Sequence, residues 1–515
     1  MLLLAFLSPS LLLLLPLILL LRPYLRNRSL RHVPGPPLAR LSSWWLLYQA
    51  RRGRRYLAVD AAHTKYGPLV RIQPNHVSIA DLDALPVVYA HSGGWTKSNY
   101  YTAFVSIARN VFSTRNRAEH TRKRKVVSHT FSAKAIAQFE QYIVSNLKEL
   151  VKQWHTLSDK ATQVGEPYAD MDVLHWFNYT AFDIIGDLAF GAPFGMLSRG
   201  RDLTEVHLTP NSPPTYAPAI EVLNRRGEVS ATLGCLPGLK PYAKYLPDPF
   251  FRNGLAAVEN LAGIAVARVN ERIQAQENGM PSRNDLLARL MEAKDENGES
   301  LGRAELTAEA LGQLIAGSDT TSNTLCALLY YSTKTPGVME KLQKEIDEVV
   351  PDNVEIPNFD TVKELPYLHM VINETLRVHS TASLGLPRVV PPGPGVTIRS
   401  HHFPPSTVLS VPTYTMHHAP AIWGPDAHEF KPSRWSPGTI TEAQKAAFVP
   451  FSVGPRACVG RNVAEMELAM IVGTVAKGFE FELRERGALE TREGFLRKPV
   501  GCRVGMRRRA RITGD

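Results

Sequence analysis

Several features that define other protein classes are scarce or absent in this sequence. Only four cysteines occur in 515 residues, and no two of them form a CxxC pair. This number is too small for a disulfide scaffold. The sequence also contains no internal repeat and no glycine-rich dinucleotide fingerprint after a strand-like run. These absences exclude a disulfide-rich secreted domain, a repeat protein and a chain that binds a nicotinamide dinucleotide itself.

Acidic residues are missing from the first 59 positions, and this asymmetry explains most of the net charge. Nine arginines lie before Asp60, so they supply nine of the eleven net positive charges and leave +2 for residues 60–515. A nearly neutral body argues against nucleic acid as a partner. With 44% hydrophobic and 21% charged residues, the chain has enough apolar surface for a large folded core.

The chain begins with a long hydrophobic run. Residues 2–21 contain no charged side chain, and a helix of this length can cross a bilayer. No basic residue precedes the run, no small-residue cleavage site ends it, and four arginines follow it by residue 31. This is not the pattern of a cleaved signal peptide. By the positive-inside rule we expect a single transmembrane anchor over 1–21, a basic and proline-rich linker over 22–50, and a cytosolic body over 51–515.

The pattern of the body is typical of a mainly α protein with a small β component. Two short strand-like runs flank Pro74-Asn75 between residues 69 and 80 and predict a hairpin. Strand-like pieces also occur within 386–413, whereas residues 199–216 are expected to form a surface loop and 419–457 a meander. Helical periodicity covers 133–155, 172–190, 253–277, 303–333, 336–349 and 361–379.

The most specific pattern lies near the C-terminal end. Residues 451–460 match FxxGxRxCxG at every fixed position, through Phe451, Gly454, Arg456, Cys458 and Gly460. This resembles the heme-ligand loop of the cytochrome P-450 family and implies a cytochrome P-450 fold after the transmembrane helix. The resemblance identifies Cys458 as the axial thiolate ligand of heme b iron, because a thiolate donates electron density that favours O–O cleavage. The two glycines would let backbone amides approach the sulfur, and Arg456 would pair with a heme propionate.

An ExxR pair agrees with this family. Glu374 and Arg377 are three residues apart and therefore share one helix face. Alone, such a pair is most simply an exposed ion pair of little energetic value. The resemblance implies instead a buried triad with Arg434 beneath the heme loop, although Ser433 stands where the family usually has Glu.

The sequence AGSDTT lies inside the expected helix over 303–333 and begins at Ala316. A glycine in mid-helix, here Gly317, costs about 1 kcal/mol relative to alanine and needs a reason. Close helix packing is one reason. The sequence also resembles the oxygen-binding groove of the family, which implies that Thr320 holds bound dioxygen and ordered water and that Asp319 relays protons.

Further basic residues occupy positions that match propionate contacts of the family. His120 and Arg124 are one helical turn apart, and Arg388 lies eleven residues after the ExxR pair. Without the family context, a basic run such as 119–125 is usually a solvated face. The resemblance implies that these three residues and Arg456 surround the two heme carboxylates.

Long phrases such as FSTRNRAEHTRKRKVVSHTFS and FDIIGDLAFGAPFGM are similar to the fungal benzoate 4-monooxygenase branch of the family. That resemblance implies hydroxylation of a small aromatic acid, benzoate, at the para position. A buried benzoate needs a cation or hydrogen bonds for its carboxylate. The candidate residues for this contact are Tyr100, Tyr101, Arg109, Arg225 and Arg226.

The hypothesis is therefore a heme-thiolate monooxygenase of the endoplasmic reticulum membrane that activates O₂. The resemblance implies electrons from NADPH through a separate NADPH–cytochrome P-450 reductase, with cytochrome b5 as a second candidate donor. Two alternatives stay open: a monooxygenase for another aromatic or secondary-metabolite substrate, and a non-catalytic membrane heme-binding protein. Asp319 and Thr320 favour an enzyme, since proton delivery is useful only where oxygen is activated.

Overall fold

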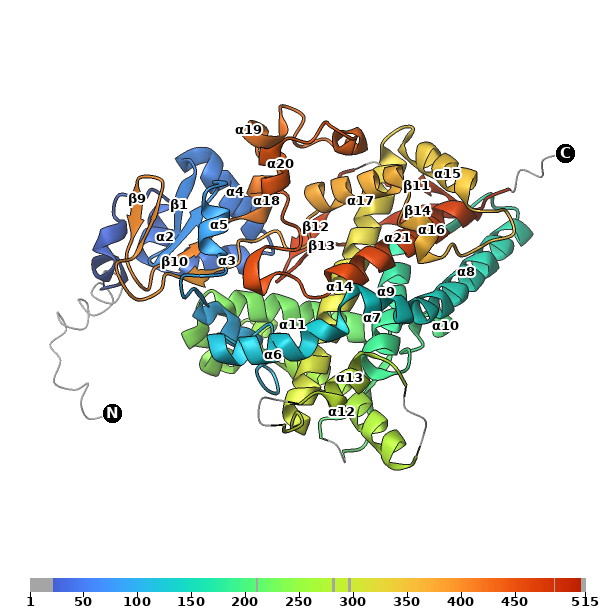
Figure 1. Ribbon diagram of the computed structural model, residues 1–515, viewed down its shortest axis with the longest axis horizontal. Coiled ribbons are helices and arrows are strands. Elements are labelled where there is room, and N and C mark those ends of the chain that lie inside the picture. The colour runs from blue at the N-terminus through green and yellow to red at the C-terminus, as the bar shows by residue number, and fades with distance from the viewer. Residues whose placement is uncertain (1–21, 210–211, 280–282, 295–297, 486, 511–515) are drawn as a thin grey trace.

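The computed structural model describes residues 22–209, 212–279, 283–294, 298–485 and 487–510. Long helices form most of the molecule, and a small mixed sheet stands at one end (Figure 1). At that end, N-terminal elements lie beside strands from the C-terminal third of the chain. The mainly helical class with a minor sheet component is therefore confirmed.

The helix α14 (Arg303–Lys334) crosses the helical part and carries the AGSDTT sequence. It packs against α9 (Val173–Phe190), which is buried on nearly all sides because its sequence is largely apolar around the helix. A Cβ atom at Gly317 would lie 2.7 Å from Ile185 Cδ1 of α9. Helix packing is thus one reason for the mid-helix glycine.

The mixed sheet joins distant parts of the chain. Its strands are β1 (Leu69–Gln73), β2 (His76–Ile79), β10 (Val408–Ser410), β7 (Arg388–Val389) and β3 (Thr96–Lys97), in that spatial order. The hairpin expected at 69–80 is confirmed, because β1 and β2 pair antiparallel across Pro74-Asn75. At the other edge, β3 pairs antiparallel with β7 and sets Lys97 opposite Arg388.

Four smaller sheets complete the β structure of the described residues. The hairpin of β12 and β13 matters most for the site, because it carries Lys498. The strands are β4 (Ala169–Asp172), β5 (Thr204–Val206), β6 (Thr215–Ala217), β8 (Val396–Ile398), β9 (His401–Phe403), β11 (Phe479–Leu483), β12 (Thr491–Glu493), β13 (Arg497–Pro499) and β14 (Arg503–Arg508).

The helices begin and end close to the expected limits, with two breaks. The expected helix over 361–379 is divided into α16 (Phe359–Val362) and α17 (Pro366–Val378), because Pro366 favours the first turn of a new helix. The helix expected from residue 133 starts as α7 (Ala133–Ile136) and continues after one 3-10 turn as α8 (Glu140–Gln163). The segment 199–216 contains β5 and part of β6 in addition to loop.

The remaining helices surround these elements. They are α2 (Pro37–Leu41), α3 (Trp44–Arg51), α4 (Arg55–Tyr66), α5 (Ala84–Val88), α6 (Arg117–Thr130), α10 (Met196–Arg199), α11 (Ala219–Gly234), α12 (Pro249–Glu277), α13 (Leu286–Glu292), α15 (Val338–Val349), α18 (Thr413–His417), α19 (Pro420–Trp423), α20 (Glu442–Ala447) and α21 (Arg461–Gly478).

The segment 22–50, expected as a linker, contains α2 and most of α3. Leu30 and Val33 are buried against the mixed sheet, and the Arg71 amide of β1 donates to the Pro34 carbonyl at 2.7 Å. The anchor expected at 1–21 lies outside the described residues. Within the residues that are described, no helix is both long and apolar enough to span a bilayer.

Candidate active site

The loop before α21 holds Cys458 in a defined backbone geometry. The Cys458 amide donates to the Phe451 carbonyl at 2.9 Å. Gly454 has a φ of +76°, and a Cβ there would lie 1.8 Å from the Tyr89 carbonyl oxygen, so this position requires glycine. The Gly460 amide, in contrast, forms a hydrogen bond with the Cys458 sulfur. The two glycines therefore have different tasks, and only Gly460 acts directly on the thiol.

The Cys458 thiol combines solvent access with dense protein surroundings. Its side chain is exposed, yet desolvation raises the pKa of the thiol, while the Gly460 amide and the charges of Arg124 and Arg461 act in the opposite direction. An amide and nearby cations are the groups that stabilise a thiolate. The position of the sulfur thus agrees with a role as an iron ligand.

Basic side chains gather beside this loop. Arg124 of α6 donates to the Ala457 carbonyl at 2.7 Å, and Arg456 donates to the Thr114 carbonyl at 2.9 Å. Arg388 donates to the Tyr101 hydroxyl at 3.0 Å. His120 of α6 and Lys97 of β3 belong to the same group, because their charges act on one another and on these arginines.

This cation cluster (Lys97, His120, Arg124, Arg388 and Arg456) carries an uncompensated positive charge mainly on its arginines, and His120 is its uncharged member. Burial and the neighbouring cations lower the pKa of His120 to about 3 and that of Arg456 to about 10, and they lower the pKa of Lys97 strongly. Within the part of the chain that the structure describes, no member forms an ion pair with a carboxylate. A pair of carboxylates is therefore the ligand that this cluster fits.

The residues present fit heme b. Its two propionates would neutralise the cation cluster, and Cys458 would bind its iron, which supplies the capacity to activate O₂. The place of Lys97 in this cluster was not expected from the sequence, which made Lys97 only a possible contact of the substrate carboxylate. Lys97 has no motif of its own and becomes visible only through the register of β3 against β7.

The oxygen groove predicted from AGSDTT lies on α14. Thr320 Oγ1 donates to the Ala316 carbonyl at 2.6 Å, and Ala316 is exposed although its helix lies among other helices. Asp319 is buried and forms an ion pair with Lys498 of β13, which also donates to Asn224 of α11. The predicted proton-relay carboxylate is thus held by Lys498 of β13, and Asn224 of α11 holds Lys498 in turn.

A second buried carboxyl group, that of Glu467 on α21, bonds to α14 one residue beyond Thr320. Thr321 Oγ1 donates to Glu467 Oε2 of α21 at 2.8 Å, and burial raises the pKa of Glu467 to about 7. This bond connects the groove helix to the helix that follows the Cys458 loop. No sequence motif indicates the contact of Lys498 with Asp319 or that of Glu467 with Thr321.

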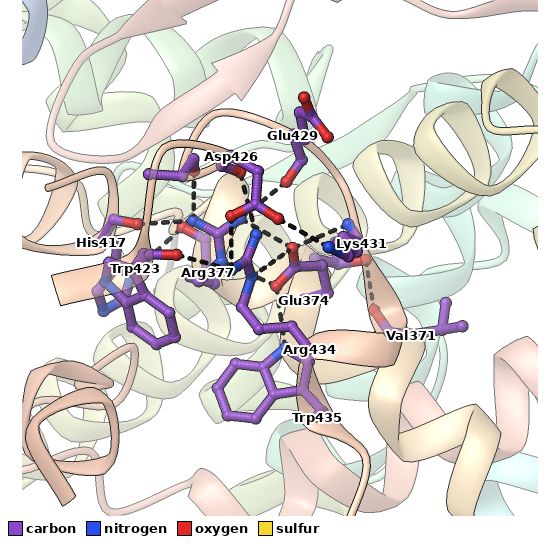
Figure 2. A network of polar contacts seen from close by, with 12 residues as sticks. Val371, Glu374, Arg377, His417, Trp423, Asp426, Glu429, Lys431, Arg434 and Trp435 are labelled. Carbon is purple, nitrogen blue, oxygen red and sulfur yellow. Dashed lines mark hydrogen bonds and ion pairs between the residues drawn. The ribbon is translucent and has the colours of Figure 1, made fainter. Parts of the chain in front are cut away.

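Glu374 and Arg377 are fully buried, and the half-buried Arg434 lies beside them (Figure 2). Arg377 and Glu374 form two hydrogen bonds of 2.8 Å, and Arg434 Nε approaches Glu374 Oε1 at 3.5 Å. Arg377 also donates to three carbonyl groups, those of His417, Ala427 and Glu429. The triad therefore fixes the backbone of the meander.

Two contacts extend the triad. Asp426 accepts from Arg434 Nη1 at 3.1 Å (Figure 2). Arg434 therefore has a second carboxylate partner although residue 433 is serine and supplies none. His417 Nε2 accepts from the Val449 amide at 3.1 Å, and the His417 carbonyl accepts from Arg377. Through His417 the triad is connected to the chain that enters the Cys458 loop.

The five residues proposed for the substrate carboxylate lie in different surroundings. Tyr100 accepts a hydrogen bond from Arg55, and Tyr101 belongs to the cation cluster through Arg388. Arg109 is exposed, and Arg225 is exposed and pairs with Glu221 at 2.8 Å. Arg226 alone among the three arginines is buried.

Comparisons with known proteins agree with this site. The chain is 62% identical over 488 residues, 95% of its length and 94% of the relative's, to a benzoate 4-monooxygenase of Aspergillus niger. It is 31% identical to a cytochrome P450 monooxygenase of Penicillium roqueforti over 87% of this chain and 89% of the relative, and 28% identical to one of Penicillium aethiopicum over 92% and 93%. The cytochrome P450 family profile matches residues 34–506. This chain belongs to the cytochrome P450 family.

Proposed function

We propose that this protein is a membrane-anchored heme-thiolate monooxygenase that hydroxylates benzoate at the para position. The observation that carries the chemistry is the combination of the Cys458 loop, the cation cluster and the Asp319–Thr320 pair of α14. The choice of benzoate is supported by the similarity to the Aspergillus niger enzyme over nearly the whole chain.

The residues of the chain have separable tasks in this reaction. The cation cluster orients the heme, and Gly460 and Arg124 stabilise the sulfur as a thiolate. Thr320 would position water or oxygen by its hydroxyl group. Asp319 would accept a proton from the Lys498 ammonium group and pass it to that water, and Lys498, whose side chain is 17% exposed, would regain a proton from solvent. Electrons come from NADPH through a separate NADPH–cytochrome P-450 reductase, with cytochrome b5 as a second donor.

Titration of the purified ferric protein with benzoate tests this function. A bound acid that displaces the water ligand should move the Soret band saturably toward its high-spin position, and turnover with reductase should give 4-hydroxybenzoate. A thiolate–heme spectrum without any shift would retain the monooxygenase and point to another aromatic or secondary-metabolite substrate. Saturable binding with no oxidised product from any aromatic acid would favour the non-catalytic heme protein.

The membrane part of the proposal concerns residues 1–21, which would form a single-pass anchor in the endoplasmic reticulum with the body in the cytosol. It is supported by the uncharged run and by the arginines that follow it. Protease added to intact microsomes should digest the body from outside. Protection of the body until the vesicles are opened would contradict this orientation.

A further inference from the structure

Arg226 of α11 is a buried cation that lacks an anionic partner. Its side chain is 5% exposed, and its Nη2 donates to the Phe104 carbonyl at 2.9 Å. Its Nε has no hydrogen-bond partner, and no ion pair involves Arg226 within the described ranges. A buried guanidinium is costly unless it is paired, so this position calls for an anion.

The guanidinium contacts an aromatic ring that is part of a larger group of rings. It lies over the Phe104 ring, with Cζ 5.4 Å from the ring centroid. Phe104 packs in turn against Phe112 and Phe495, with centroid distances of 5.7 and 5.1 Å, and these last two are 5.1 Å from each other. Arg226 thus lies at the edge of an aromatic cluster (Phe104, Phe112 and Phe495), which is suited to the face of a benzene ring.

The chain just before this cluster contacts the N-terminal part of α14, ahead of the groove. Just before Phe112, the Asn110 side chain donates to the Ala308 carbonyl at 3.2 Å, and the Val111 amide donates to Glu309 Oε1 at 3.0 Å. The charge of Asp319 also acts on Arg226. Asn224, two residues before Arg226 on α11, accepts from Lys498, which pairs with Asp319, so Arg226 lies near the Asp319–Thr320 pair.

The charged residues around Arg226 do not neutralise it. Asp319, the acid whose charge acts on Arg226, is already paired with Lys498. Lys240 also lies near Arg226, and it donates only to the Ala103 and Val105 carbonyls, at 3.2 and 3.1 Å. A monoanion at Arg226 would therefore neutralise one of the two cations that lack an anionic partner in this region.

We propose that Arg226 binds the carboxylate of the substrate while the aromatic cluster packs against the substrate ring. This inference rests on the proposed function and narrows it, because it makes one residue responsible for the preference for small aromatic acids. The free Nε and the other N–H groups of the Arg226 guanidinium can donate to both carboxylate oxygens.

The test compares Arg226→Gln with Arg225→Gln by spectral titration of the ferric proteins with benzoate and with neutral benzaldehyde. Arg225 is the matched control, since it is the preceding residue on the same helix and pairs only with the exposed Glu221. We expect Arg226→Gln to weaken benzoate binding on the order of 100-fold, which corresponds to loss of a buried charge-assisted pair. Binding of benzaldehyde should change little, and Arg225→Gln should match the wild type for both ligands.

Equal benzoate affinity in Arg226→Gln and the wild type would overturn the inference and leave the proposed function intact. Failure of the wild type to bind any aromatic acid would instead reject the proposed function together with the inference. If Arg226→Gln does not fold with heme, Arg226→Lys takes its place. This variant retains the positive charge but not the planar guanidinium, so it should bind benzoate more weakly than the wild type. Equal binding would count against the inference.

Discussion

At the scale of single residues, the site depends on buried ionisable groups that are each held by one or two partners. Glu467 has Thr321 as its hydrogen-bond partner, and Asp319 is held by Lys498. Burial acts in opposite ways on acids and bases, and it raises the pKa of Glu467 while it lowers that of His120. The protonation of Glu467 and of His120 is therefore set by the fold.

Glu467 predicts a pH dependence of stability. Its pKa rises from 4.5 in the unfolded chain to about 7 in the folded protein, so the folded state retains a proton that the unfolded state loses. The contribution of Glu467 to the free energy of unfolding is complete below about pH 4.5. It is lost as the pH rises to about 7, and the total loss is about 3 kcal/mol. In Glu467→Gln the melting temperature should fall less over this range.

The control for this measurement is Glu465→Gln. Glu465 lies on the same helix but is only half-buried, and it pairs with Arg461 at 2.7 Å. The pH profile of this variant should follow the wild type. A Glu467→Gln profile parallel to the wild type would show that Glu467 ionises normally in the folded protein.

Asp319→Asn tests the proton relay. The amide retains the shape of the side chain but cannot carry a proton, so hydroxylation should slow roughly 100-fold. The thiolate–heme spectrum should stay unchanged, because Asp319 bonds to Lys498 and not to the Cys458 loop. Turnover at the wild-type rate with an intact spectrum would remove Asp319 from the relay.

At the scale of elements, the triad connects α17, the meander and the Cys458 loop. Replacing Glu374 by Gln leaves Arg377 and Arg434 without their shared carboxylate in the interior. We expect a destabilisation of about 3–5 kcal/mol and poor heme retention, measured by thermal unfolding and by the heme-to-protein absorbance ratio. Glu442→Gln, in the exposed pair with Lys445 on α20, is the control and should change neither quantity. Normal heme content in Glu374→Gln would mean that the triad does not position the loop.

Motifs contained in one stretch of sequence could be predicted from their spacing. Contacts between stretches, such as that of Arg434 with Glu374, could be predicted only where the family resemblance implied them. The Cys458 loop, the ExxR pair and AGSDTT are each short, and their spacing on one helix or loop already fixes which side chains lie together. Lys97 joins the cation cluster only because β3 pairs with β7, and Lys498 reaches Asp319 from a hairpin near the C-terminus. The breaks at Pro366 and before Glu140 were missed because the hydrophobic period continues through both.

At the scale of the whole molecule, positive charge is concentrated in two places. The first is the arginine-rich stretch before Asp60, and the second is the buried cation cluster beside Cys458. The first agrees with a membrane surface and the second with heme carboxylates.

Removal of residues 1–21 tests whether membrane anchoring and heme binding reside in different parts of the chain. The truncated protein should bind heme like the full chain, because the cation cluster and Cys458 lie in the folded body. It should also be released from membranes by alkaline carbonate, whereas the full chain should stay in the pellet. Equal retention of both proteins would assign the anchoring to another part of the chain.

The central claim is that Cys458 provides a thiolate to heme iron, and the absorption spectrum of the reduced protein with carbon monoxide tests it most directly. The wild type should show the Soret band at the long wavelength typical of thiolate ligation. Cys458→His should retain heme through the cation cluster but show the shorter-wavelength band of imidazole ligation. An unchanged long-wavelength band in Cys458→His, or its absence in the wild type, would contradict the account.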